Sequence, residues 1–154
     1  MRTKGCAFVL LVLSVAALAA QSPFSGTWKL NLQKSKLAPG DPTAKDIAYI
    51  TVDDTSFRIR EQFTDRQGSV MMMTWDAKFD GKDYPVQGFP PADAVVLRRD
   101  GQKILGTMKK AGKAVSTFEA TVSKDGKVTT VNAVDLTQKP EDATEVFIYD
   151  KQPN

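Results

Sequence analysis

The chain has 154 residues, with 21 basic and 18 acidic side chains, one cysteine and no histidine. The lack of histidine excludes the usual zinc sites, haem iron held by a proximal histidine, and nucleophiles activated by histidine. A net charge of +3 gives no concentrated basic patch of the kind that binds nucleic acid. We therefore expect no metal ion, no cofactor and no nucleic-acid partner.

Residues 1–20 have the composition of a secretory signal peptide. Arg2 and Lys4 give a positively charged start, and an almost unbroken apolar run follows from Ala7 to Leu18. This run is shorter than the roughly 20 apolar residues that a membrane-spanning helix needs. An uncleaved membrane anchor is therefore the less favoured alternative.

We expect cleavage after Ala19 or Ala20 and export to the periplasm or the medium, with no stable membrane insertion afterwards. Cleavage would remove two basic and no acidic residues, which lowers the net charge from +3 to +1. It would also remove Cys6, so the mature chain could form no disulfide. The remaining residues, 21–154, are sufficient for one domain with an ordinary hydrophobic core.

Short segments rich in Val, Ile, Thr, Phe and Tyr alternate with turn signals throughout this domain, and none of helical length has a helical apolar period. The expected strands are Gly26–Asn31, Asp46–Val52, Phe57–Thr64, Ser69–Phe79, a short piece near Asp83–Tyr84, Ala94–Arg99, Gln102–Lys109, Ala114–Lys124, Lys127–Leu136 and Thr144–Asp150. We predict an all-β, antiparallel up-and-down barrel of roughly eight to ten strands, because closure removes the unpaired edges of a long meander. An open sandwich is the alternative.

Asp-Gly pairs allow the faces of the strands to be assigned, since this dipeptide favours two-residue hairpin turns. A turn at Asp100-Gly101 would place Leu97 opposite Ile104 on an inner face. A turn at Asp125-Gly126 would give the inner face Ser116, Phe118, Ala120, Val122, Val131, Ala133 and Asp135. A slip by one residue would exchange the inner and outer faces.

The first expected strand contains Gly26-Thr27-Trp28, which resembles the Gly-x-Trp start of the lipocalin and fatty-acid-binding-protein (calycin) superfamily. The continuation Lys34-Ser35 is similar to small lipocalin-like domains of exported bacterial proteins, most of which have no assigned function. The resemblance implies that Gly26 permits a tight start to the strand and that Trp28 plugs one end of the barrel. It also implies that Lys151 packs on the Trp28 ring as a cation–π partner.

The segment Val146–Lys151 resembles the closing strand of intracellular fatty-acid-binding proteins, in which an Arg-x-Tyr pair grips a carboxylate inside the barrel. Tyr149 matches the tyrosine, but Phe147 stands where the arginine belongs, so the resemblance does not supply a carboxylate clamp. The stretch Leu32–Ala44 also departs from the family, because it is too short and too rich in Pro and Gly for a helix-turn-helix lid.

The candidate ligand-binding residues lie on predicted inner faces: Phe57, Ile59, Glu61, Phe63, Met71, Met73, Trp75, Arg99, Phe118, Asp135 and Tyr149. Aromatic rings and pliable methionines would form the wall. Glu61, Arg99 and Asp135 would be its polar anchors, and burial would raise the pKa of either acid. The alternative is that Glu61 or Asp135 pairs with Arg99 or lies at the wet rim.

Three functions remain open at this point. The first is noncovalent binding or carriage of a small, largely apolar ligand, because a barrel of about eight strands can hold one. The second is a protein-interaction or structural module of the cell envelope with a filled core, whose outer face of Arg98, Lys103 and Lys109 would meet an unknown partner. The third is an enzyme that uses Glu61 or Asp135 as a general acid or base.

Overall fold

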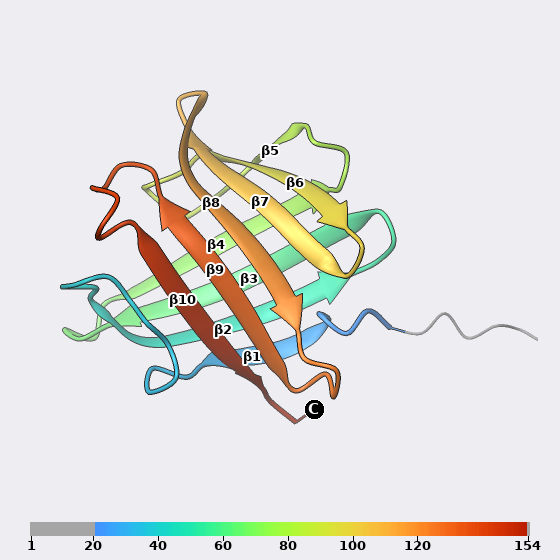
Figure 1. The fold of residues 1–154 in the computed structure, drawn as a ribbon, viewed down its shortest axis with the longest axis horizontal. Coiled ribbons are helices and arrows are strands. Elements are labelled where there is room, and N and C mark those ends of the chain that lie inside the picture. Colours follow the sequence, from blue (N-terminus) through green and yellow to red (C-terminus); the bar gives the residue numbers. More distant parts are fainter. Residues whose placement is uncertain (1–20, 154) are drawn as a thin grey trace, which may run out of the picture.

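The computed structural model describes residues 21–153, so the expected signal peptide lies outside the described residues. The described chain consists of ten antiparallel strands (Figure 1). They are β1 (Gly26–Leu30), β2 (Thr43–Val52), β3 (Ser56–Asp65), β4 (Val70–Lys78), β5 (Asp83–Pro85), β6 (Ala94–Asp100), β7 (Lys103–Lys110), β8 (Lys113–Val122), β9 (Val128–Asp135) and β10 (Thr144–Lys151). Each strand end lies within three residues of its predicted position. Between residues 21 and 153 no helix is long and apolar enough to cross a membrane.

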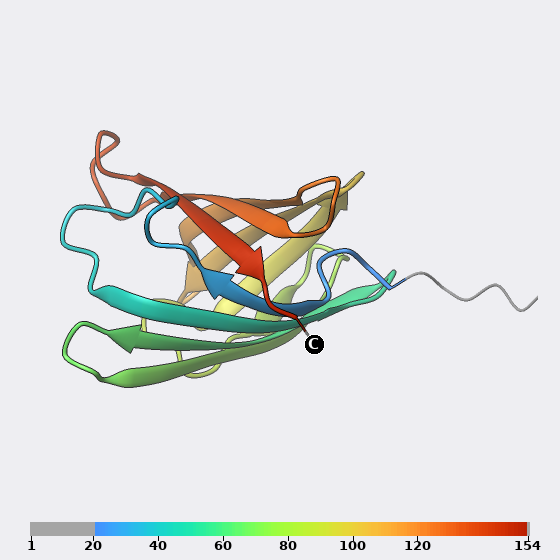
Figure 2. The ribbon, with the colours of Figure 1, turned by 90° about the horizontal axis from the view of Figure 1, so that it is seen from below.

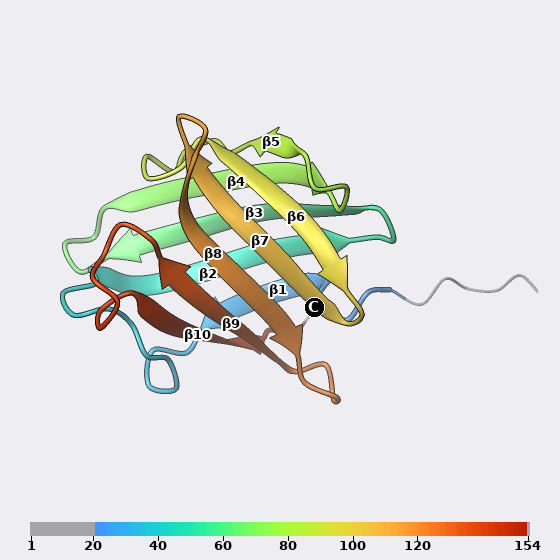
Figure 3. The same ribbon diagram turned by 45° about the horizontal axis from the view of Figure 1, so that its top comes forward.

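The strands form one sheet in the order β4-β3-β2-β1-β10-β9-β8-β7-β6-β5. Neighbours in this order are also neighbours in sequence, except at the β1–β10 seam. The two edges of the sheet meet where Thr74 of β4 and Gln87, just after β5, exchange two backbone hydrogen bonds of 3.0 Å (Figure 3). The predicted antiparallel barrel is confirmed, and it is nearly closed.

Gly88 makes this closure possible. Its φ is +72°, and a Cβ built on it would lie only 1.8 Å from the backbone oxygen of Met72 in β4. The next residue, Phe89, stacks on Phe63 of β3 with ring centroids 6.1 Å apart. The loop after β5 is therefore fastened to the β3–β4 edge by one backbone bridge and one aromatic contact.

Of the two hairpin predictions, one has the correct register and one does not. Phe118 pairs with Ala133, as the turn at Asp125-Gly126 requires. In the other hairpin Leu97 pairs with Gly106 instead of Ile104, because Asp100 pairs with Lys103 and the turn falls on the two residues between them. The slip keeps every side chain on its predicted face, since the pairing changes by an even number of residues.

The β1–β10 seam brings Gly26, Trp28 and Lys151 together. Trp28 is buried, and its indole Nε1 donates a hydrogen bond of 2.7 Å to the Phe24 carbonyl. Lys151 Nζ lies 5.0 Å from the centroid of the Trp28 ring and donates to the carbonyl of Pro23 at 3.2 Å. A Cβ on Gly26 would lie 2.7 Å from Lys151 Cε, so the missing side chain leaves room for the lysine.

The two ends of the barrel interior differ in packing. At the end where β2 and β6 finish, called here the packed end, inward side chains such as Val52, Leu97 and Ile104 are almost fully buried. Toward the opposite end, where β2, β8 and β10 begin, several inward apolar side chains such as Phe63, Met71 and Phe147 are only half-buried, whereas Val95 and Met108 are buried. Figure 2 shows the β2–β4 and β8–β10 portions of the sheet facing each other across this second end, called here the open end.

Candidate functional site

Three polar side chains meet in the barrel interior. Asp46 on β2, Glu61 on β3 and Tyr149 on β10 are 1%, 6% and 8% exposed. The Tyr149 hydroxyl lies 2.7 Å from Asp46 Oδ2 and 3.2 Å from Glu61 Oε1. We call these three residues the carboxyl–tyrosine cluster.

Strand alternation and the barrel topology explain why the cluster forms. Asp46 lies on the same face of β2 as Ala48, and Ala48 is paired with Glu61 on β3, so both acids point inward. Tyr149 is opposite Leu30 of β1, the strand that separates β10 from β2. The long phenol spans the width of β1 to reach the Asp46 carboxyl group.

Burial controls the protonation of the two acids. It raises the pKa of Asp46 to about 6, against the lowering effect of hydrogen bonds from Tyr149 and Glu61. The pKa of Glu61 is raised well above its usual value, first by burial and then by the neighbouring Asp46. Burial also raises the pKa of Tyr149, which stays protonated. The cluster therefore favours a single negative charge, with the proton on Glu61, whose pKa is raised more than that of Asp46.

The single negative charge has no cation beside it. Every ion pair within residues 21–153 joins side chains other than Asp46 and Glu61. Tyr149 donates its one hydroxyl proton to Asp46, the nearer acceptor, and its oxygen can accept the acid proton of Glu61. This relay satisfies one Asp46 oxygen and leaves the charge stabilised by hydrogen bonds alone.

Three buried polar atoms on the inner face find no hydrogen-bond partner within the described chain. They are Asp46 Oδ1, Thr129 Oγ1 and Trp75 Nε1. Thr129 on β9 is 4% exposed and lies directly opposite Tyr149 on β10, so it shares the inner face with the cluster. Buried polar groups are nearly always hydrogen-bonded in folded proteins. Two of these unsatisfied atoms belong to the cluster or to its neighbouring strand.

The predicted apolar wall residues all face the interior, but to different depths. Phe57, Ile59, Met73 and Trp75 are buried in the core. Trp75 stacks on Phe57, with ring centroids 6.2 Å apart, and makes a tilted contact with Phe118 at 6.5 Å. Phe63 and Met71 are half-buried and lie toward the open end, whereas the half-buried Phe118 lies in the middle of β8. The second group is the part of the predicted wall that a ligand could touch.

Arg99 and Asp135 do not join the cluster. Arg99 is exposed near the end of β6, where its guanidinium lies 4.5 Å from the centroid of the Phe79 ring. Asp135 is the last residue of β9, and its Oδ1 accepts hydrogen bonds from the backbone N and the hydroxyl of Thr137, at 2.8 Å and 2.6 Å. Both were expected to be interior anchors or ion-pair partners of each other. Their places near strand ends put them at opposite rims of the barrel, which for Asp135 is the alternative of a place at the wet rim.

The sequence analysis missed Asp46 and Thr129 as site residues. Asp46 lies at spacings of two from Ala48, Ile50 and Val52, so the period-two pattern predicts that it shares their inward face. Thr129 pairs with Val122, which the Asp125-Gly126 turn had already placed on the inner face. Two half-buried inward apolar residues, Val131 and Phe147, were also left out.

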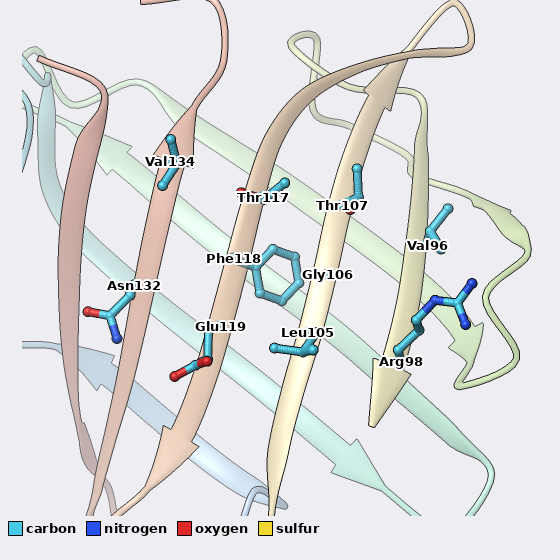
Figure 4. A pocket seen from close by; sticks show the side chains of 10 residues that line it. All are labelled: Val96, Arg98, Leu105, Gly106, Thr107, Thr117, Phe118, Glu119, Asn132 and Val134. Carbon is cyan, nitrogen blue, oxygen red and sulfur yellow. The ribbon is translucent and has the colours of Figure 1, made fainter. Parts of the chain in front are cut away.

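A hollow of about 500 Å³ lies across the outer face of strands β6–β9 (Figure 4). Its lining includes Val96, Leu105 and Val134. The Phe118 ring occupies the inner space that Gly106 leaves empty, since a Cβ on Gly106 would lie 2.1 Å from Phe118 Cζ.

Two of the three cations expected on this outer face form ion pairs: Lys103 pairs with Glu119 at 3.0 Å, and Lys109 pairs with Asp83 at 2.7 Å. The third, Arg98, is exposed, lines the hollow and makes no ion pair within residues 21–153.

Comparison with known proteins supports the fold. Neither family models nor curated proteins match the sequence. Among solved structures, the zebrafish ileal bile acid-binding protein complexed with cholic acid is similar, with 13% identity and a TM-score of 0.55. The match covers 85% of this chain and all of that one. At this identity the likeness shows the fold alone: the protein is a nearly closed antiparallel barrel like that of the bile acid-binding protein.

Proposed function

We propose that the protein binds a small, largely apolar ligand noncovalently inside its barrel. The observation that carries the proposal is the half-buried state of inward apolar side chains at the open end, among them Phe63, Met71 and Phe147. Side chains of a close-packed core would be fully buried, so their exposure indicates space that other atoms can fill. A bound cholic acid in a protein of the same fold supports this proposal.

In this proposal the open-end residues form the ligand wall and the carboxyl–tyrosine cluster forms its polar end. Of the residues predicted from the sequence, Phe63, Met71, Phe118, Glu61 and Tyr149 would touch the ligand directly. The buried Phe57, Ile59, Met73 and Trp75 would support them from behind. Asp46, Thr129, Val131 and Phe147 complete the site.

Titration with a neutral lipophilic dye such as Nile red tests this function. We expect saturable binding with one site per chain and a rise in dye fluorescence. Phe63→Ala should weaken binding roughly three- to tenfold, because part of an aromatic contact of about 1 kcal/mol is lost. Tyr49→Ala is the matched control, since Tyr49 is an exposed aromatic residue on the neighbouring strand. Dye binding that does not saturate, or that both variants weaken equally, would contradict the proposal.

We also propose that the chain is exported and processed after Ala19 or Ala20. The charged start and apolar run of residues 1–20 support this proposal. Expression of the full chain in a bacterial host, followed by cell fractionation and intact mass measurement, tests it. The expected product begins at Ala20 or Gln21 and lies outside the cytoplasm, whereas a product that retains Arg2 and Lys4 would overturn the proposal.

A further inference from the structure

We propose that the ligand is an amphipathic amine, an apolar body carrying a protonated amino group that Asp46 receives beside Glu61 and Tyr149. This inference rests on the proposed function and adds the chemistry of the ligand's polar end. We expect the site to bind such amines more tightly than carboxylates that carry the same apolar body.

Charge is the first support for an amine. The cluster buries two acids and no base, and each ion pair of the described chain lies elsewhere. A buried charge without a partner is costly unless a counter-charge or hydrogen bonds compensate it. A ligand ammonium would supply the missing counter-charge, whereas a ligand carboxylate would place a second negative charge beside Asp46.

Hydrogen-bonding capacity is the second support. Tyr149 satisfies Asp46 Oδ2, but Asp46 Oδ1 is an acceptor with no donor among residues 21–153. Thr129 Oγ1 on β9 is also unsatisfied and shares the inner face, but β1 and β10 separate its strand from β2. An ammonium group carries three N–H donors and no acceptor, so it complements the free acceptor Asp46 Oδ1.

The position of the cluster is the third support. The inward residues next to Asp46 and Glu61 toward the open end include the half-buried Phe63 on β3, two residues from Glu61. On β10, the half-buried Phe147 lies two residues from Tyr149 on the same face. An amine at the cluster would thus have its apolar body against aromatic side chains on both sides of the interior.

Three ligands with the same dodecyl chain and different head groups test the inference: dodecylamine, dodecanol and dodecanoate. Their affinities are measured by displacement of Nile red at neutral pH and below their micelle concentrations. We expect dodecylamine to bind roughly tenfold or more tightly than dodecanol, and dodecanoate to bind more weakly than both, because hydrogen bonds to a charged group are the stronger kind. Equal or tighter binding of dodecanoate would overturn the inference, whereas absence of binding by all three would overturn the proposed function itself.

Asp46→Asn removes the charge and should abolish the preference for dodecylamine over dodecanol while dodecanol binding persists. Glu119→Gln is the matched control, because it removes one acid from the outer face and should keep the preference. A preference that survives in folded Asp46→Asn would contradict the inference.

If Asp46→Asn does not fold, the wild-type protein supplies a second measurement. The groups that face Asp46 are Tyr149, Glu61 and Asp41, none of them basic. Acidification from about pH 7.5 to about pH 4.5 protonates Asp46 while the amine stays charged, so the advantage of dodecylamine over dodecanol should shrink several-fold. An advantage that is unchanged over this range would equally overturn the inference.

Discussion

A single phenol proton holds the polar part of the interior together. Tyr149 is within hydrogen-bond distance of two carboxyl groups that are both almost inaccessible to water. Removing one partner from such a network leaves buried acceptors unsatisfied, which costs more than the bond itself contributes. The stability of the fold is therefore sensitive to atoms of the cluster that make few apolar contacts.

Tyr149→Phe should destabilise the protein by about 1–3 kcal/mol, because it leaves Asp46 Oδ2 without the hydroxyl donor and Glu61 without its hydrogen-bond partner. Urea unfolding followed by tryptophan fluorescence measures this loss. Tyr49→Phe removes a hydroxyl from an exposed ring and should change the free energy of unfolding by less than about 0.5 kcal/mol. Equal effects of the two substitutions would argue against a structural role for the hydroxyl.

The raised pKa of Asp46 predicts a pH dependence of stability. The folded protein holds this proton up to about pH 6, whereas the unfolded chain releases it near its usual value of 3.8. Between these limits the folded state binds more protons, so stability is full below pH 3.8 and is lost as the pH rises toward 6. The pKa values of surface acids such as Asp53 and Asp150 are lowered in the fold. These acids make the free energy of unfolding rise with pH, but at more acidic pH than the contribution of Asp46.

We therefore expect the free energy of unfolding to fall by roughly 1 kcal/mol per pH unit from about pH 4 to about pH 6 as a contribution of Asp46. Urea titrations of the wild type and of Asp46→Asn across this range isolate the contribution as the difference in slope. Parallel pH profiles for the two proteins would show that Asp46 ionises normally in the fold.

Alternation along single strands was enough to predict that Glu61 and Tyr149 face inward, and it also applied to Asp46. It could not show that β2, β3 and β10 meet around one point, since that depends on the β1–β10 pairing across the whole chain. Arg99 and Asp135 obeyed the same alternation yet lie at the rims. Position along the barrel axis, which alternation does not encode, separates these residues from the cluster.

At the scale of elements, the turns determined how well the pairing could be predicted. Asp125-Gly126 sits at the centre of the β8–β9 loop, and the predicted register is correct. In the β6–β7 hairpin Asp100 instead closes the last strand pair with Lys103, so the two-residue turn starts at Gly101 with φ +57°. Both arrangements place a glycine where φ is positive, which is why composition alone did not distinguish them.

The closure between β4 and the residues after β5 depends on Gly88. Gly88→Ala should destabilise the protein by about 1–3 kcal/mol, because the residue combines positive φ with a backbone contact that leaves no room for a Cβ. Hydrogen exchange of the Thr74 and Gln87 amides should accelerate, since these two groups form the closing bridge. Gly101→Ala is the matched control, with positive φ but open space around its Cβ position. Unchanged exchange at Thr74 and Gln87 in Gly88→Ala would contradict this account.

At the scale of the molecule, a barrel that binds a ligand at its open end should gain stability from that ligand. A ligand that binds only the folded state at about 100 times its Kd adds roughly 2.7 kcal/mol to the free energy of unfolding. We expect dodecylamine to raise the melting temperature in proportion to the logarithm of its concentration. Differential scanning fluorimetry measures the shift. If a ligand that is already shown to bind left the melting temperature unchanged, binding inside the barrel would be contradicted.

The pairing of β1 with β10 has a consequence for how the chain matures. Trp28 cannot receive the ammonium of Lys151, and β1 cannot gain its second neighbour, until more than a hundred intervening residues have left the ribosome. Barrel closure must therefore follow synthesis of nearly the entire domain.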